Sequence, residues 1–186
     1  MTRDLQQQHR WSTDGFLRAW EAGAFDDSRV EMVEGQVWPV SIGSWHGRTT
    51  GRVVRSLSNS AYEITSESLV LSSSVVDPDL WVREAAATPQ RMASRRMALW
   101  FPADVLLVVE VGDETLHADL TTKARLYGAH GFARYWVIGP DAVHEHTGPT
   151  RFGYRTVRQY WPGDELPVPY AGTSLDVAAL LGVDQE

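Results

Sequence analysis

Three side chains along the sequence have the chemistry needed to cleave a phosphodiester. Asp79 follows Pro78 and opens an apolar, strand-like segment, Glu110 ends the apolar run 105–109, and Lys123 lies in the helical segment that comes next. Two carboxylates suit a hard divalent cation, because such cations prefer oxygen ligands. An amine beside them can stabilise the negative charge that develops on the phosphate. If the fold brings these groups together, they would support metal-dependent hydrolysis.

Each of these residues also has a plainer interpretation. Glu110 ends a strand that is otherwise apolar, and a buried charge without a partner costs several kcal/mol, so a cation should lie opposite it. Alternatively, Glu110 only marks where the strand reaches solvent. Asp79 is of a type common in turns. Lys123 shares the inward helix face of Leu120, yet it is also spaced to pair with Asp119 on the helix surface. Spacing alone leaves both interpretations open.

The remaining segments predict how such a site would be held. A continuous apolar run such as 105–109 is typical of a central strand buried on both faces. The first half of the sequence predicts a helix capped by Ser12 or Thr13 and ending near Gly23, a hairpin at 29–33 and 36–40, and a helix at about 45–59. Strands at 62–64, 69–71 and 79–82 follow, and then a polar surface excursion between 83 and 101. The second half predicts the strand 105–109, a helix at 115–130, strands at 134–138, 142–146 and 152–157, and a closing helix capped by Ser174. This order predicts an α/β (α+β) fold with a mixed central β-sheet flanked by helices.

Length and composition limit the function classes. The 186 residues suit one domain, expected over 12–186 after a flexible terminus at 1–11. The absence of cysteine excludes thiolate chemistry, so any metal must be held by oxygen or imidazole. No apolar run is long enough to span a bilayer and no signal peptide is evident, so we expect a cytoplasmic protein. The net charge of -7 argues mildly against indiscriminate binding to a phosphate backbone.

The order and spacing of several segments resemble one known family. The matching segments are 29–35 (RVEMVEG), His46, 78–80 (PDL), 102–111 (PADVLLVVEV), 119–127 with Lys123 inside it, Gly131, and 135–138 (YWVI). From about residue 12 to 181 the chain resembles the Uma-type restriction endonuclease family of the PD-(D/E)xK nuclease superfamily. The resemblance implies a restriction-endonuclease-like fold and a Mg²⁺-dependent or Mn²⁺-dependent endonuclease that hydrolyses DNA. It also leads us to expect a homodimer, because cutting both strands of a duplex generally takes two active sites.

The same resemblance assigns roles to individual residues. It implies that Asp79, Glu110 and the Val111 carbonyl hold the metal, and that Lys123 is the catalytic lysine. The superfamily usually carries that lysine two residues after the glutamate, where this chain has Gly112. Glu31 and His46 match further positions lining the same pocket. From periodicity alone Glu31 would be an outward charge on the hairpin and His46 only a residue at a helix start.

Other features leave alternatives open. The segment 112–114 (GDE) replaces the family's Ser/Pro-rich turn after the glutamate, and Glu34 stands where the family usually has Asp before glycine. The altered turn favours a catalytically inactive nuclease-like fold that serves as a nucleic-acid or protein binding module. A further alternative is cleavage of RNA or of a small phosphodiester.

Weaker signals lie outside these segments. His144 and His146 would share a strand face, as in some metal sites, although an exposed hairpin is the plainer explanation. Arg48, Arg52 and Arg55 could follow a phosphate backbone or form a solvated helix face paired with local acids. Trp81 and Trp136 lie in predicted strands and are expected in the core.

Overall fold

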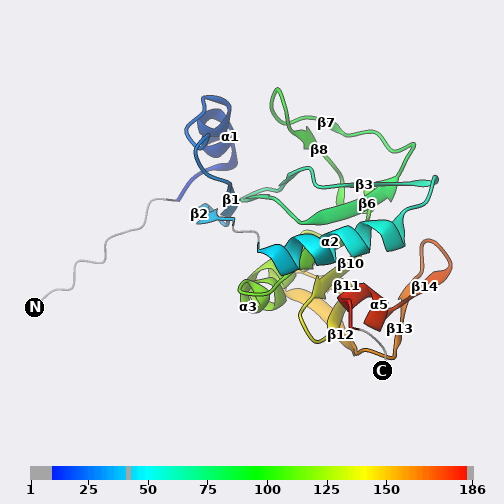
Figure 1. Ribbon diagram of the computed structural model, residues 1–186. Coiled ribbons are helices and arrows are strands. Elements are labelled where there is room, and N and C mark those ends of the chain that lie inside the picture. Colours follow the sequence, from blue (N-terminus) through cyan, green and yellow to red (C-terminus); the bar gives the residue numbers. More distant parts are fainter. Residues whose placement is uncertain (1–9, 41–42, 184–186) are drawn as a thin grey trace, which may run out of the picture.

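The centre of the molecule is a mixed β-sheet. The structure is a computed structural model that describes residues 10–40 and 43–183. Within these residues one sheet has six strands in the order β12-β11-β10-β9-β6-β3 (Figure 1). Its members are β3 (Tyr62–Thr65), β6 (Leu80–Glu84), β9 (Val105–Val111), β10 (Arg134–Ile138), β11 (Val143–Thr150) and β12 (Gly153–Tyr160). The mixed sheet flanked by helices confirms the expected fold class.

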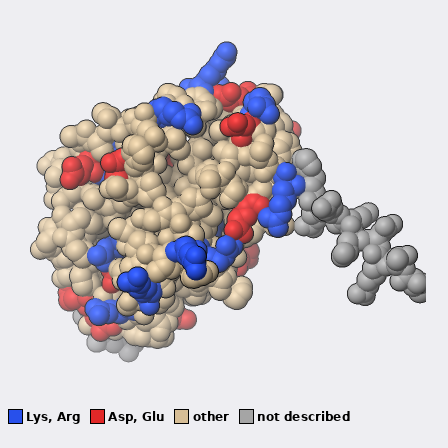
Figure 2. Space-filling model, turned by 180° about the vertical axis from the view of Figure 1, so that it is seen from behind, with Lys and Arg blue, Asp and Glu red and all other residues tan. Residues whose placement is uncertain are grey.

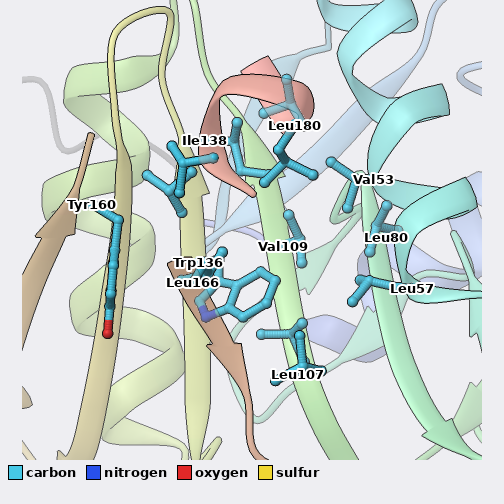
Figure 3. Packing of buried hydrophobic residues seen from close by; sticks show 14 of the residues in the cluster. Val53, Leu57, Leu80, Leu107, Val109, Trp136, Ile138, Tyr160, Leu166 and Leu180 are labelled. Carbon is cyan, nitrogen blue, oxygen red and sulfur yellow. The ribbon is translucent and has the colours of Figure 1, made fainter. Parts of the chain in front are cut away.

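Strand β9 is the central element, as its apolar run predicted. It pairs parallel with β10 and antiparallel with β6, and six of its seven residues are buried. Helix α2 (Ser44–Leu57) and the short helix α5 (Val177–Leu181) cover one face of the sheet, where Val53, Leu107 and Leu180 belong to one apolar cluster (Figure 3). Trp81 and Trp136 are fully buried, as expected for core residues.

The opposite face carries the helical segment that contains Lys123. It consists of α3 (Leu116–Ala118), a π-helical segment η2 (Asp119–Lys123) and α4 (Ala124–Ala129), so the helix predicted at 115–130 is present but wider in its middle. In a π-helix each N–H bonds the carbonyl five residues back instead of four, and such segments are frequent at functional sites. Here both ends of the π-helical segment, Asp119 and Lys123, are buried.

A second layer lies beside the main sheet. It contains a sheet of β1 (Val30–Val33), β2 (Gln36–Pro39), β4 (Leu69–Val70) and β5 (Val75–Val76), together with α1 (Thr13–Glu21) and the hairpin of β7 (Arg91–Met92) and β8 (Ala98–Leu99). The Ser12 hydroxyl caps α1 by accepting a hydrogen bond from the Gly15 N–H, as predicted. Phe16, Met32 and Met97 belong to the apolar cluster that joins these pieces. Figure 1 shows α1 and the β7–β8 hairpin on the same side of the molecule.

Three local expectations were wrong. The segment 83–101 is not only a surface excursion, because Met97 and Trp100 are buried. Residues 10 and 11 are packed against the β1–β2 turn, where the Trp11 N–H donates to the Gly35 carbonyl at 2.8 Å. The rest of the terminus predicted to be flexible, residues 1–9, lies outside the described residues.

The third error concerns the end of the chain. Ser174 does not cap the closing helix but lies in β14 (Thr173–Asp176), which pairs with β13 (Glu165–Val168). The cap of α5 is Asp176, whose carboxylate accepts the Ala179 N–H at 3.0 Å. None of the helices in the described ranges combines the length and the apolar character that crossing a bilayer requires.

Candidate active site

The register between β6 and β9 brings the first two carboxylates together. Leu80 lies opposite Val109 in this antiparallel pair, so Asp79 and Glu110 follow at the same end of the two strands. Oδ2 of Asp79 accepts the Val111 N–H at 2.6 Å. Oδ1 of Asp79 lies 2.7 Å from Nε2 of His46, near the start of α2. Both oxygens of Asp79 are therefore held in place, one by a backbone amide and one by an imidazole.

Lys123 lies at the centre of the candidate site. Its amine is 3.0 Å from Oε1 of Glu110 and 3.0 Å from Oε1 of Glu31, and the side chain is almost fully buried. Oδ1 of Asp119 is farther away, at 3.8 Å. The amine therefore faces the acids of two strands as well as the acid one helical turn earlier. The pairing with Asp119 that the sequence suggested is present, but inside the protein instead of on a solvated helix surface.

Glu31 points inward, against the expectation from alternation along the hairpin. It is only 4% exposed, because the helical segment that carries Lys123 lies against the side of β1 that a free hairpin would turn to solvent. Its Oε2 accepts the Asp77 N–H at 3.3 Å, while its Oε1 faces Lys123. Glu31 thus joins the second layer to the acids of the main sheet.

Two further residues of the site were not found from the sequence. The Tyr127 hydroxyl donates to Oε1 of Glu110 at 2.9 Å. Asp119 is 1% exposed, and its Oδ1 is buried without a hydrogen-bond partner among the described residues. Each lies four residues from Lys123 along the chain, and this helical spacing is the signal that could have identified both.

The position of the lysine has a steric explanation at Gly112. A Cβ atom at Gly112 would lie 2.6 Å from Oδ2 of Asp119 and 2.9 Å from Cα of Leu116. The Asp119 carboxylate is held there by the Thr115 hydroxyl, which donates to Oδ2 at 2.7 Å. The place where the superfamily usually carries its lysine is therefore filled, and Lys123 reaches the acids from the helix instead.

Burial and neighbouring charges shift the pKa values of Glu110, Asp119 and Lys123. Burial raises the pKa of Glu110 well above its ordinary value, and the negative charges of Asp79, Asp119 and Glu31 act in the same direction, against the amine of Lys123. Burial also raises the pKa of Asp119. For Lys123, burial favours the neutral amine, but the surrounding carboxylates outweigh it and raise its pKa, so this lysine stays charged.

His46 completes the charge pattern. Its hydrogen bond with Asp79 raises the pKa of the imidazole, an effect that burial opposes. Its Nδ1 is buried and has no hydrogen-bond partner among the described residues. One lysine and one histidine thus face four acids, Glu31, Asp79, Glu110 and Asp119, which leaves an excess of carboxylate oxygen in a buried place.

That excess suits a divalent cation, which needs oxygen ligands and compensating negative charge. Throughout residues 10–40 and 43–183, however, no three histidine or acidic side chains are arranged to hold a metal as they stand. The reason is visible in the contacts above. Both oxygens of Asp79 are bonded to protein groups, and Oε1 of Glu110 faces both Lys123 and Tyr127. These carboxylate oxygens are of the type that binds a divalent cation. In this structure they bond to protein groups instead.

The weaker sequence signals do not join this site. His146 is 3% exposed and its ring lies against Tyr135 and Tyr154, so it is a buried aromatic neighbour instead of part of an exposed hairpin. Its partner in the predicted pair, His144, approaches the Gln159 side chain at 3.3 Å. Arg52 donates to the carbonyls of Leu180 and Leu181 at the end of α5, so it is a helix-capping residue and not part of a phosphate-binding row.

Comparison with known proteins agrees with this fold and identifies the family. A crystal structure titled as that of "a putative nuclease belonging to DUF820" from Anabaena variabilis ATCC 29413 superposes with a TM-score of 0.73 at 16% sequence identity, covering 93% of this chain and 98% of that chain. The fold is thus shared with a protein described as a nuclease. No curated protein matches this chain. The family model described as "Uma2: Putative restriction endonuclease" matches residues 15–178, and the chain belongs to this family.

Proposed function

We propose that this chain is a metal-dependent endonuclease that hydrolyses phosphodiester bonds in DNA. The observation that carries the proposal is the buried contact of Lys123 with Glu31 and Glu110, next to Asp79, in a member of a restriction endonuclease family. Burying one amine among several acids is costly for stability alone, since replacing buried ion pairs by apolar groups is often neutral or stabilising. A catalytic use explains the arrangement.

The residues divide the work by their charge. Asp79, Glu110 and the Val111 carbonyl would hold Mg²⁺ or Mn²⁺, as the family resemblance implies. When bound, such a cation supplies positive charge at a phosphate oxygen and makes a water more acidic. Lys123 keeps its proton, because the acids around it raise its pKa, and so it serves as a hydrogen-bond donor to the negative charge that develops on the phosphate.

His46 is suited to move a proton. Asp79 fixes its ring through Nε2. Nδ1, which no group in the described part of the chain bonds, is the atom that would take a proton from the attacking water. This pairing of an acid with an imidazole is the same orienting device that hydrolases use on other folds. Tyr127 and Asp119 position Glu110 and Lys123 instead of touching the substrate.

Cleavage assays with matched variants test the proposal. Single-stranded DNA, duplex DNA and RNA are incubated with Mg²⁺, Mn²⁺ or EDTA, using wild type, Asp79→Asn, Glu110→Gln, Lys123→Met and the control Glu84→Ala. Glu84 is an exposed acid at the end of β6 away from Asp79, so its variant should cut like wild type. We expect DNA cleavage that EDTA abolishes and a loss of about a hundredfold or more in the three site variants. Full activity in those variants, with folding verified by circular dichroism, would refute the assignment.

The contacts already made by Asp79 favour one second candidate. A chain whose acids stay bonded to His46, Val111 and Lys123 would be a nuclease-like binding module without cleavage. Isothermal titration of wild type and Asp79→Asn with Mg²⁺ and Mn²⁺ separates the two functions. A nuclease should bind the metal at a site that Asp79→Asn abolishes, whereas the binding module should show no such site. We further propose a homodimer for cleavage of duplex DNA, which sedimentation velocity with and without a duplex would test.

A further inference from the structure

A cavity beside the candidate active site is suited to hold one nucleoside of the substrate. Its volume is about 440 Å³, within the range of small-molecule sites. It lies between the end of α1, the loop before β1 and the β7–β8 hairpin, and we call it the α1 pocket. The lining residues used here are Trp20, Phe25, Asp26, Arg29, Asp77 and Arg96.

Asp77 connects the pocket to the active site through a hydrogen bond to Glu31. The backbone N–H of Asp77, which lines the pocket, donates to Oε2 of Glu31, whose other oxygen is 3.0 Å from Lys123. Two residues farther along the chain is Asp79. The guanidinium of Arg29 is among the charges that act on both Asp77 and His46. A phosphodiester at Lys123 would therefore place a neighbouring nucleoside next to this cavity.

The walls of the pocket are fixed by contacts within the second layer. Phe25 stacks on Phe16 with ring centroids 5.2 Å apart. The Arg95 N–H donates to Oε1 of Glu21 at 2.6 Å, which ties the tip of the β7–β8 hairpin to the end of α1. The Arg96 guanidinium lies 6.0 Å from the centroid of the Trp20 ring. Aromatic and cationic groups are thus presented together at one opening.

The composition of the pocket distinguishes a nucleoside from a simple anion. Trp20 and Phe25 are aromatic residues that line the pocket, and aromatic side chains can bind a base by stacking. The aspartates, including Asp26 and Asp77, would repel free phosphate but can accept hydrogen bonds from the N–H groups of a base. Arg29 is exposed and lines the pocket, and its guanidinium can pair with the phosphate attached to that nucleoside.

We propose that the α1 pocket binds the nucleoside next to the cut phosphodiester, with its base on Trp20 and its phosphate at Arg29. The proposal rests on the nuclease function proposed above and adds a substrate contact to it. Because the pocket belongs to the second layer, it would also give that layer a role in holding the strand. A free nucleotide could use the same chemistry, and the test separates the two sources.

Binding is measured first, without any need for cleavage. Fluorescence titrations in EDTA use deoxyadenosine and deoxyadenosine monophosphate with wild type, Trp20→Ala, Trp20→Phe, Arg29→Gln and the control Trp161→Ala. Trp161 is exposed and does not line the pocket. We expect about tenfold weaker binding of both ligands to Trp20→Ala, rescue by Trp20→Phe, and weaker binding of the monophosphate alone to Arg29→Gln. Equal affinities in wild type, Trp20→Ala and Arg29→Gln would overturn the proposal.

A second arm uses oligonucleotides with an abasic residue on either side of the cut, again by binding in EDTA and then by cleavage with Mg²⁺. We expect about tenfold weaker binding for one of the two positions in wild type and no such loss in Trp20→Ala. Binding of free nucleotides at Trp20 with no abasic effect would overturn the assignment to the substrate strand.

If cleavage occurs while neither arm responds, the pocket proposal fails and the nuclease proposal stands. If free nucleosides bind in a Trp20-dependent way but no oligonucleotide is cut, the nuclease proposal fails, and with it the assignment of the pocket to a cut strand, and only nucleoside binding by the α1 pocket stands.

Discussion

At the scale of single residues, Lys123 and the acids around it define the chemistry that the site can perform. A lysine whose pKa is raised by its neighbours cannot act as a base, so any proton must move through another group. Nδ1 of His46 has no hydrogen-bond partner within residues 10–40 and 43–183, and Asp79 orients the ring, whereas Glu110 is bonded to Lys123 and Tyr127. These contacts support the proposed roles of Lys123 and His46, whereas the metal-holding roles of Asp79 and Glu110 are taken from the family resemblance.

A second residue-scale consequence concerns His146, which lies outside the site. Burial lowers the pKa of His146 from 6.5 to about 4, and the neighbouring His144 acts in the same direction. In the unfolded chain this imidazole therefore becomes protonated below pH 6.5. In the folded protein it stays neutral until the pH falls to about 4. Stability contributed by neutral His146 is complete above pH 6.5 and is lost as the pH falls through this window.

The variant His146→Phe should remove that loss. Phenylalanine fits the aromatic surroundings of Tyr135 and Tyr154, and Nε2 of His146 has no hydrogen-bond partner among the described residues that the change would break. Relative to wild type, we expect a gain of about 1.4 kcal/mol in unfolding free energy for each pH unit below 6.5. Urea unfolding between pH 7.5 and 4.5 measures it, with exposed His117→Gln as the control. Parallel pH profiles for wild type and His146→Phe would contradict the prediction.

At the scale of elements, the helical segment after β9 determines where the lysine can be. Asp119 and Leu116 occupy the space next to Gly112, and the π-helical segment places Asp119 and Lys123 on the same buried side. A lysine cannot be returned to position 112 without displacing the carboxylate or the helix backbone. The displaced lysine is therefore a property of this helix and not an isolated substitution.

This steric argument predicts the outcome of a lysine swap. The double variant Lys123→Ala with Gly112→Lys should remain inactive, because a Cβ at 112 would lie 2.9 Å from the Cα of Leu116, a backbone atom that cannot rotate away. It should also be less stable than Lys123→Ala alone by about 1–3 kcal/mol, as overpacked cores are. Cleavage assays and urea unfolding of both variants provide the measurements. Recovery of cleavage in the double variant would show that the loop can make room.

The contact between α4 and the start of β12 gives an independent prediction. A Cβ at Gly128 would lie 2.4 Å from the carbonyl carbon of Gly153. Any side chain at position 128 would therefore clash with the backbone of β12. Gly128→Ala should lower the unfolding free energy by about 1–3 kcal/mol or more. Gly47→Ala in α2 is the matched control, since no described atom beyond its neighbours and its own helix backbone lies within 4 Å of the added methyl group, and it should stabilise by about 0.5–1 kcal/mol. Similar unfolding midpoints for both variants would contradict the packing described here.

The sequence predicted those elements whose local pattern and tertiary setting agree. The strand 105–109 was found because its apolar run has one explanation, and the helix of Lys123 because its spacing is regular. The family resemblance placed Glu31 in the pocket, whereas periodicity alone would have turned it outward, because alternation along a hairpin does not show that the helical segment of Lys123 lies against that side. Ser174 was taken for a helix cap because serine favours caps, whereas pairing of β14 with β13 moves the helix start to Asp176. Tyr127 was missed because a tyrosine on an apolar helix face is usually core, and its hydroxyl contact depends on the neighbouring strand.

At the scale of the whole molecule, charge limits how nucleic acid can bind. The chain carries a net charge of -7, and on the face in Figure 2 the lysines and arginines form separate groups, several with acidic residues beside them. Arg52 is used to cap α5 and Arg125 pairs with Glu34 at 2.7 Å, so neither is free for phosphates. Binding to a strand should therefore depend on a few local contacts near the site and not on a continuous positive surface.

This pattern predicts a shallow salt dependence of DNA binding. Each phosphate contact on a single strand contributes a slope of about −0.7 in a plot of log affinity against log salt concentration. With about four contacts or fewer, the slope should be no steeper than about −3. Fluorescence anisotropy in EDTA at several salt concentrations measures it, and Arg29→Gln should make the slope shallower by about 0.7. Arg151→Gln, whose guanidinium lies over Phe152 and outside the α1 pocket, should leave it unchanged. A slope of about −6 would mean that many dispersed basic residues bind the strand, and local recognition next to the active site would then have to be abandoned.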